Sequence, residues 1–143
     1  KTLLDILTDM YLEYGLYREK LINIVRKGKE GADEIKAMRK GYRNNPPMTI
    51  NKSKVVKISD YEILESKDIL TGKKTKINLP QSDVLQFFLE DGSKISVRPS
   101  GTEPKIKFYF SVNTKLESAS KLAETEKELD QRIDGIISDM KLA

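Results

Sequence analysis

The sequence predicts an α+β fold in which an antiparallel sheet carries helices on one face. Alternating apolar and polar residues, typical of half-buried strands, recur between residues 84 and 112. Apolar residues at helical spacing occur near the start, over residues 32–42, and in a long final segment. The predicted strands therefore gather in the middle of the chain, and the predicted helices flank them.

The first helix is predicted over residues 2–14. Leu3 and Leu7 lie at helical spacing, Thr2 suits the N-cap, and Gly15 suits the C-terminal stop. By its pattern alone, this segment is an ordinary amphipathic helix that would pack on its own domain.

A strand and a second helix follow. Residues 21–25 form a short apolar run typical of a strand. Residues 32–42 place apolar side chains on one face, with Asp33 and Glu34 in the first turn, where acidic groups favour a helix. The two prolines at 46–47 end this segment.

The middle of the chain is predicted to be mostly strand. Residues 55–58 and 63–64 form predicted strands. The polar stretch 66–76 is rich in lysine, and we interpret it as an exposed turn rather than a phosphate-facing loop. Its three nearby lysines are Lys73, Lys74 and Lys76.

Two further predicted strands, 84–89 and 94–98, are joined by a turn at Asp91 and Gly92, a residue pair typical of hairpins. Alternation resumes over residues 105–112, where Phe108 and Phe110 should be buried.

The last helix is predicted to begin at Thr114. Glu117 lies three positions later, as in a capping box. An apolar stripe then continues to Met140, and we expect it to pack on the sheet.

The loop between the last two strands has the chemistry of an anion site. Alternation places Arg98, Lys105 and Lys107 on the solvent side of one hairpin. Ser100 and Thr102 add hydroxyls, and Gly101 permits backbone N–H groups to converge. A guanidinium, two hydroxyls and nearby ammonium groups suit a phosphate dianion. Ordinary turn residues and solvated lysines would explain the same pattern.

Composition limits the classes of function. The 143 residues are 38% hydrophobic and 34% charged, as in a soluble globular domain. Neither cysteine nor histidine is present, which excludes disulfides, thiolate or imidazole metal sites, and Ser-His-Asp triads. The formal net charge of +4 argues only weakly for nucleic acid. We find no membrane span or signal peptide in the sequence and expect a cytoplasmic protein.

The run Arg-Pro-Ser-Gly-Thr-Glu-Pro-Lys-Ile-Lys-Phe-Tyr, residues 98–109, resembles the phosphate-binding loop of the α-D-phosphohexomutases. This family contains the phosphoglucomutases and phosphomannomutases. The resemblance is to their C-terminal domain, about the last quarter of a member, and it implies a fragment with a fold similar to the TATA-binding-protein half.

The resemblance implies substrate-phosphate binding by Arg98, Ser100, Gly101 and Thr102. It adds Lys107 as a fifth contact, because some members of the family carry at that position an arginine that also reaches the phosphate. It implies structural roles for Glu103 and Pro104 and leaves Lys105 ambiguous. In the full-length enzyme a phosphoserine would transfer the phosphoryl group between the 1- and 6-positions of a hexose through a sugar bisphosphate.

The resemblance also assigns Mg²⁺ and the phosphoserine to other domains, and this chain has neither a Thr-Ala-Ser-His-Asn-Pro motif nor an Asp-Gly-Asp motif. The chain is therefore expected to hold no metal or cofactor and to be inactive by itself. Its partners would be a sugar phosphate and the other three domains, with no membrane; the composition disfavours nucleic acid as a partner. The identity of the sugar stays open.

The ending Tyr-Leu-Glu-Tyr-Gly of the first helix, residues 11–15, resembles the helix that leads out of the third domain of these mutases. We therefore interpret residues 1–15 as a linker helix and residues 16–143 as the C-terminal domain. Two other functions remain open: a stand-alone module that binds anions or nucleic acid, and a purely structural or interaction domain.

Overall fold

An eight-stranded antiparallel sheet organises the fold, in a computed structural model that describes residues 2–99 and 104–140. The strand order is β1-β8-β7-β6-β3-β4-β5, and β2 pairs with β3 off this path. In chain order the elements are α1 (Leu3–Tyr14), β1 (Leu16–Val25), α2 (Gly28–Asn44), β2 (Thr49–Ile50), β3 (Ser53–Asp60), β4 (Glu65–Asp68), β5 (Lys74–Lys76), β6 (Leu85–Leu89), β7 (Lys94–Pro99), β8 (Lys105–Thr114), a 3₁₀ turn (Ala119–Lys121) and α3 (Leu122–Asp139).

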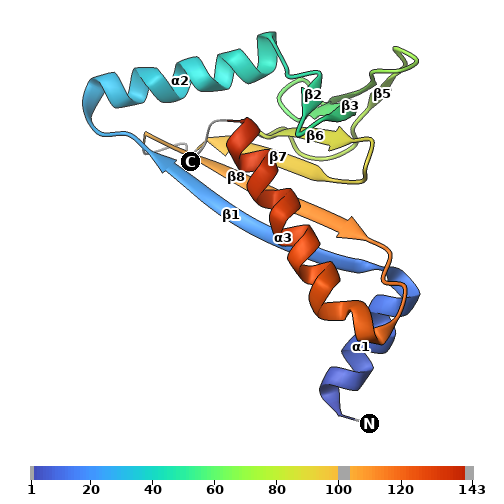
Figure 1. The fold of residues 1–143 in the computed structure, drawn as a ribbon. Coiled ribbons are helices and arrows are strands. Elements are labelled where there is room, and N and C mark those ends of the chain that lie inside the picture. Colours follow the sequence, from blue (N-terminus) through green and yellow to red (C-terminus); the bar gives the residue numbers. More distant parts are fainter. Residues whose placement is uncertain (1, 100–103, 141–143) are drawn as a thin grey trace.

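Helices α2 and α3 cover one face of this sheet, and α3 lies across β1 and β8 (Figure 1). Alternate strand residues point into the resulting core, and Phe87, Phe108 and Phe110 are fully buried there. The Tyr42 ring of α2 meets the Phe108 ring edge-on, with centroids 5.8 Å apart. The predicted α+β architecture and the predicted burial of both phenylalanines in β8 are confirmed. The opposite face of the sheet is called the open face below.

Helix α1 begins and ends as predicted. The Thr2 hydroxyl accepts a hydrogen bond from the Asp5 N–H, and the Asp5 carboxylate accepts one from the Thr2 N–H, which together form a capping box. Gly15 ends the helix with φ +93°, a conformation that favours glycine. None of the residues of α1 is buried.

Strand β1 is longer than predicted and begins at Leu16 instead of residue 21. The charges at its centre concealed it, because Arg18 and Lys20 look like solvent-facing loop residues in the sequence. Both instead form ion pairs with α3: Arg18 contacts Asp130 at 3.0 Å, and Lys20 contacts Asp134 at 4.0 Å.

Helix α2 also extends beyond the predicted range, from residue 28 to residue 44. Its start packs tightly against the preceding chain. A Cβ at Gly31 would lie 2.6 Å from the Arg26 carbonyl carbon, so only glycine fits there.

The region between β3 and β6 corrects two predictions. Residues 63–64 lie in a turn, not in a strand, and Leu64 has φ +53°. The stretch 66–76 is not a plain turn, because it contains most of β4 and all of β5, which pair with each other. Charged and polar strands on the exposed edge of a sheet lack the apolar alternation that would reveal them.

The connection into α3 corrects a third prediction. Thr114 does not cap a helix; it is the last residue of β8, opposite Leu16 of β1. The 3₁₀ turn comes next, and α3 begins at Leu122 without a side-chain cap. The predicted apolar stripe does pack on the sheet, through Leu129, Ile133 and Ile136. The hairpin turn at Asp91 and Gly92 also forms, with Gly92 at φ +90°.

Candidate anion-binding site

Three polar side chains form a row across the open face where β7 and β8 meet their connecting loop. Arg98 of β7 lies directly opposite Lys107 of β8, and Lys107 lies opposite Asn23 of β1. Directly paired residues of antiparallel strands project from the same face. The three side chains therefore lie side by side, with strand spacings of about 4.8 Å. They are called the Arg98 row below: Arg98, Lys107 and Asn23.

The residues that flank the connecting loop are held by the fold. Pro99 projects to the helix side of the sheet and lines a small cavity with Arg39 and Tyr42 of α2. On the other flank, the Arg26 N–H donates a hydrogen bond to the Pro104 carbonyl oxygen at 2.9 Å. The two ends of the loop are thus fixed relative to β1 and α2.

Arg98 differs from the other arginines in its electrostatic environment. The sequence contains six arginines. Five form ion pairs with carboxylates: Arg18, Arg26, Arg39, Arg43 and Arg132. Arg98 is exposed, and no carboxylate within the described residues pairs with it. In the described part of the chain, no carboxylate therefore occupies its guanidinium donors.

Arg43 shows the contrasting case on the helix side. Its guanidinium donates two hydrogen bonds to Asp60, at 2.9 and 3.1 Å, and also contacts Glu62 at 2.8 Å and Asp83 at 3.3 Å. The bond to Asp60 is the largest cause of the raised pKa of Arg43. Arg39 contacts Asp83 at 2.6 Å. We call Arg39, Arg43, Asp60, Glu62 and Asp83 the arginine–carboxylate cluster.

The lysines also differ in whether a carboxylate pairs with them. Lys105 and Lys107 have no ion-pair partner in the described part of the chain. The lysine-rich stretch around β5 does have a carboxylate partner, because the Lys74 ammonium contacts Glu65 at 3.5 Å. Asp68 also lines the shallow hollow beside Lys73. These carboxylates favour the interpretation of residues 73–76 as an exposed hairpin.

The structure brings two of the predicted phosphate contacts, Arg98 and Lys107, directly together. The predicted contacts Ser100, Gly101 and Thr102 lie outside the described residues, as does Glu103. Asn23 was not identified from the sequence. Only the pairing of β1 with β8 reveals its position, and a lone asparagine in an apolar strand gives no sequence signal.

The described residues do not fit a magnesium site. Over residues 2–99 and 104–140, no group of three or more histidine, cysteine, aspartate or glutamate residues is arranged to hold a metal ion. The carboxylates that do gather, Asp60 and Asp83, are occupied by guanidinium groups. None of the described helices is long and apolar enough to cross a membrane.

Comparisons with known proteins identify the family to which the chain is related. The family model described as the C-terminal domain of phosphoglucomutase/phosphomannomutase matches residues 21–131. A phosphoglucomutase of Staphylococcus haemolyticus is 41% identical over 113 residues, which are 79% of this chain and 20% of that protein. A phosphoglucomutase of Staphylococcus saprophyticus is 36% identical over 111 residues, which are 78% of this chain and 20% of that protein.

The chain thus spans about a fifth of the length of the curated relatives it matches. Among solved structures, it is similar to the open form of parafusin, a phosphoglucomutase from Paramecium. That match has a TM-score of 0.47 and 18% identity, and it covers 96% of this chain and 23% of the other.

Proposed function

Because the chain belongs to the family of phosphoglucomutase/phosphomannomutase C-terminal domains, we propose that it binds the phosphate group of a hexose phosphate. The enzyme that contains it would interconvert hexose 1-phosphate and hexose 6-phosphate. The observation that carries this proposal is the Arg98 row, in which a guanidinium and an ammonium lie side by side and no carboxylate of the described residues pairs with either.

Each residue of the proposed site has a distinct role. The planar guanidinium of Arg98 can donate two parallel hydrogen bonds to phosphate oxygens, and Lys107 adds a point charge beside it. From the sequence motif we assign the Ser100 and Thr102 hydroxyls, together with the backbone at Gly101, to the remaining oxygens. A site made of such groups recognises a phosphate and does not discriminate between sugar configurations.

This selectivity suits the reaction that the family resemblance implies. The site would hold the phosphate that is not being transferred, which aligns the reactive end of the sugar with the phosphoserine of another domain. The same grip would help to close the active site against water, which would otherwise hydrolyse the phosphoenzyme. Because the site does not distinguish between sugars or sugar orientations, the bisphosphate can reverse its orientation between the two half-reactions.

The rest of the enzyme would supply the phosphoserine, the loop that reads the sugar, and Mg²⁺. We therefore expect the chain alone to show no turnover of glucose 1-phosphate in a coupled assay. Measurable turnover by the purified chain would contradict this assignment. We also propose that the protein is located in the cytoplasm.

Helix α1 is proposed to be the linker from the preceding domain. Its apolar side chains Leu3, Leu4, Ile6 and Met10 are all exposed, between 48% and 74%. An apolar helix surface of this size is normally covered in a soluble protein. The portion of the relatives that this chain does not match is the natural partner.

An NMR titration of the ¹⁵N-labelled chain tests the proposed function. Inorganic phosphate and glucose 6-phosphate should shift the amides of the Arg98 row at millimolar concentrations. A single-stranded oligonucleotide should not shift them at comparable concentrations. Stronger shifts with the oligonucleotide would instead support the nucleic-acid module, and no shifts with any ligand would support a structural domain.

A further inference from the structure

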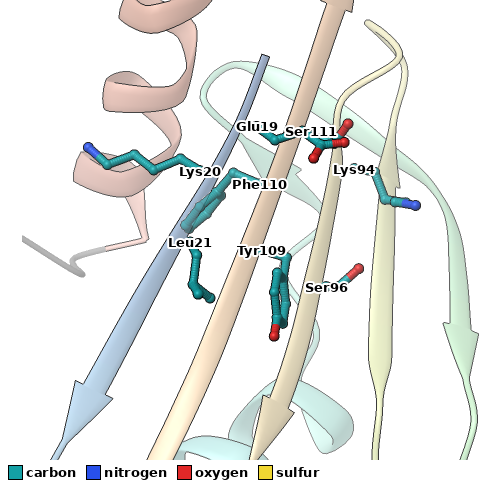
Figure 2. Close-up of a pocket in the computed structure, with 8 residues that line it drawn as sticks. All are labelled: Glu19, Lys20, Leu21, Lys94, Ser96, Tyr109, Phe110 and Ser111. Atoms are coloured by element: carbon teal, nitrogen blue, oxygen red, sulfur yellow. The ribbon is translucent and has the colours of Figure 1, made fainter. Parts of the chain in front are cut away.

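The sheet ends in two edge strands that differ in length and charge. Strand β5, at one edge, has only the three residues of Lys74–Lys76, and two of them are lysines. Short, charged edge strands resist pairing with other strands. Strand β1, at the other edge, is ten residues long, and residues 21–25 contain neither a charged residue nor a proline. In Figures 1 and 2, β1 has β8 along one side and no strand along the other, and within the described residues it pairs with β8 alone.

Alternate residues of β1 present their backbone groups to this free edge. Arg26 follows the strand, and its N–H donates a hydrogen bond to the Pro104 carbonyl oxygen on the β8 side. In an antiparallel pair, such residues alternate with residues whose N–H and C=O point away from the neighbouring strand. Leu21, Asn23 and Val25 are therefore directed to the free edge. The Val25 oxygen accepts one hydrogen bond from the Arg26 guanidinium, at 3.2 Å, and keeps a second lone pair for a further donor.

The side chains along this edge are mostly apolar. Leu21 is 45% exposed and Val25 is 52% exposed, and the exposed Asn23 lies between them on the open face. Ile22 and Ile24 point to the helix side, where they are only partly buried. An uncharged, apolar stretch with free backbone groups is complementary to another extended strand.

The sequence of β1 complements itself in one antiparallel register. When Asn23 lies opposite its counterpart in a second copy, Leu21 lies opposite Val25. On the other face of the same pair, Ile22 lies opposite Ile24. Every apolar residue then meets an apolar residue, and the two-fold axis repeats each contact. A slip of two residues in one direction would instead set Leu21 opposite Asn23.

The charges at the ends of the pairing fit the same register. Glu19 lies opposite Lys27, the extended residue before α2, at both ends of the paired region. Within the described residues neither side chain forms an ion pair in its own chain. Lys20 and Arg26 would also lie opposite each other, but each already pairs with a carboxylate of its own chain, in α3 and α2 respectively. Figure 2 shows Lys20 directed toward α3.

We propose that two copies of this chain pair antiparallel through β1, so that their two sheets join into one. The two-fold axis passes beside Asn23, and the paired region extends from Glu19 to Lys27. Asn23 also belongs to the Arg98 row, but Lys107 and Arg98 lie one and two strands inside the edge, so pairing leaves both uncovered. The contact is a single pair of strands, and we therefore expect a dimer that forms at millimolar chain concentration and dissociates on dilution.

Sedimentation of the chain over a dilution series and amide hydrogen exchange by NMR test this dimer together. The amides of Leu21, Asn23 and Val25 should exchange more slowly as the chain concentration rises. The amides of Ile22 and Ile24 point to β8 and should be protected at every concentration, which makes them an internal control. A chain that stays monomeric throughout would overturn the proposal. A dimer that leaves the three edge amides unprotected would also overturn it.

A charge exchange tests the register. Glu19→Lys and Lys27→Glu should each weaken dimerisation about tenfold, because repulsion replaces attraction at two symmetry-related pairs. The double variant restores opposite charges and should return to within about threefold of wild type. Glu90→Lys is the control: it makes the same change of charge in the turn between β6 and β7, away from β1, and should leave dimerisation within about twofold of wild type. Failure of the double variant to recover would contradict the proposed register.

The exposed apolar surface of α1 is the competing interface. Leu4 of α1 is 64% exposed, and Leu4→Glu places a charge in the middle of that surface. Dimerisation should be unchanged in Leu4→Glu if the two copies meet through β1. Loss of the dimer in this variant, with retention in Glu19→Lys, would place the contact on α1 and overturn the proposal.

Discussion

Two neighbouring residues at the end of β7 face opposite environments. Pro99 points to the helix side and lines a cavity with members of the arginine–carboxylate cluster. Arg98 points to the open face, where it lies beside Lys107 and no carboxylate pairs with it within the described residues. The same residue type, arginine, is thus neutralised on one side of the sheet and left available on the other.

The difference follows from burial. The Arg43 side chain is 21% exposed and the Asp60 side chain 11%, so each charge needs its partner to offset lost hydration. Arg98 is exposed, and water can solvate it until a ligand binds. Arg39 and Arg43 therefore serve to attach α2 to the sheet. We propose that Arg98, which has no carboxylate partner among the described residues, binds an anion.

The largest expected effect compares the two faces of β8. Phe110→Ala should lower the free energy of unfolding by about 3–5 kcal/mol, because it leaves a cavity in the core. Tyr109→Ala, on the exposed face of the same strand, should change it by less than about 0.5 kcal/mol. Urea denaturation of both variants checks this. A small effect of Phe110→Ala would mean that the assigned register is wrong by one residue.

The next effect tests the structural role of the arginine–carboxylate cluster. Arg43→Ala should cost about 2–3 kcal/mol in unfolding free energy, because it leaves the buried Asp60 carboxylate without its charged donor. Arg26→Ala is the matched control, because the Arg26–Glu34 pair is about half exposed on both sides and should contribute less than about 1 kcal/mol. Equal losses in the two variants would contradict the distinction between buried and exposed pairs.

Unlike Arg43→Ala, the Arg98→Ala variant should leave stability unchanged and lower catalytic efficiency. Unfolding free energy should stay within about 0.5 kcal/mol of wild type. In an intact mutase that contains this domain, kcat/KM should fall by about 1.5–3 kcal/mol, roughly 10- to 150-fold, through loss of a charged hydrogen bond. Arg98→Lys should recover only part of this loss, since an ammonium cannot reproduce the planar guanidinium. Unchanged kcat/KM in both variants would remove Arg98 from the site.

The smallest effect concerns an exposed pair between β1 and α3. The hydrogen bond from Arg18 holds the pKa of Asp130 below its ordinary value near 3.8. A lowered pKa in the folded state means that the pair stabilises the fold above pH 3.8, and that this contribution is lost as pH falls through the lower folded value. In Arg18→Gln the Asp130 pKa should rise toward its ordinary value, measured by NMR titration of the carboxyl group. An unchanged Asp130 pKa would show that the pair does not form in solution.

Elements with apolar periodicity were predictable from the sequence. The alternation over residues 84–112 gave β6, β7 and most of β8 correctly, because one side of these strands is buried in a continuous core. Several elements that sequence reasoning missed or shortened, namely β1, β4 and β5, carry charged residues along their length. Arg18 and Lys20 in β1 are accommodated by carboxylates of α3, which lie more than a hundred residues away in the chain.

The candidate site, too, was only partly predictable from the sequence. The position of Arg98 beside Lys107 on one face was predictable because both belong to one contiguous motif with a regular alternation. Asn23 comes from β1, and only the pairing of β1 with β8 places it beside Lys107. Among the described residues, the absence of carboxylate partners around Arg98 is likewise a property of the fold and has no sequence signature.

The most direct test of the central claim is the affinity of the chain for inorganic phosphate at low ionic strength, measured by NMR in Arg98→Gln and Lys73→Gln. Each variant removes one exposed positive charge, so nonspecific electrostatics affects both equally. We predict that Arg98→Gln weakens binding about tenfold or more and that Lys73→Gln leaves it within about twofold of wild type. Weaker binding in Lys73→Gln together with unchanged binding in Arg98→Gln would place the anion at the β4–β5 hairpin and contradict the account.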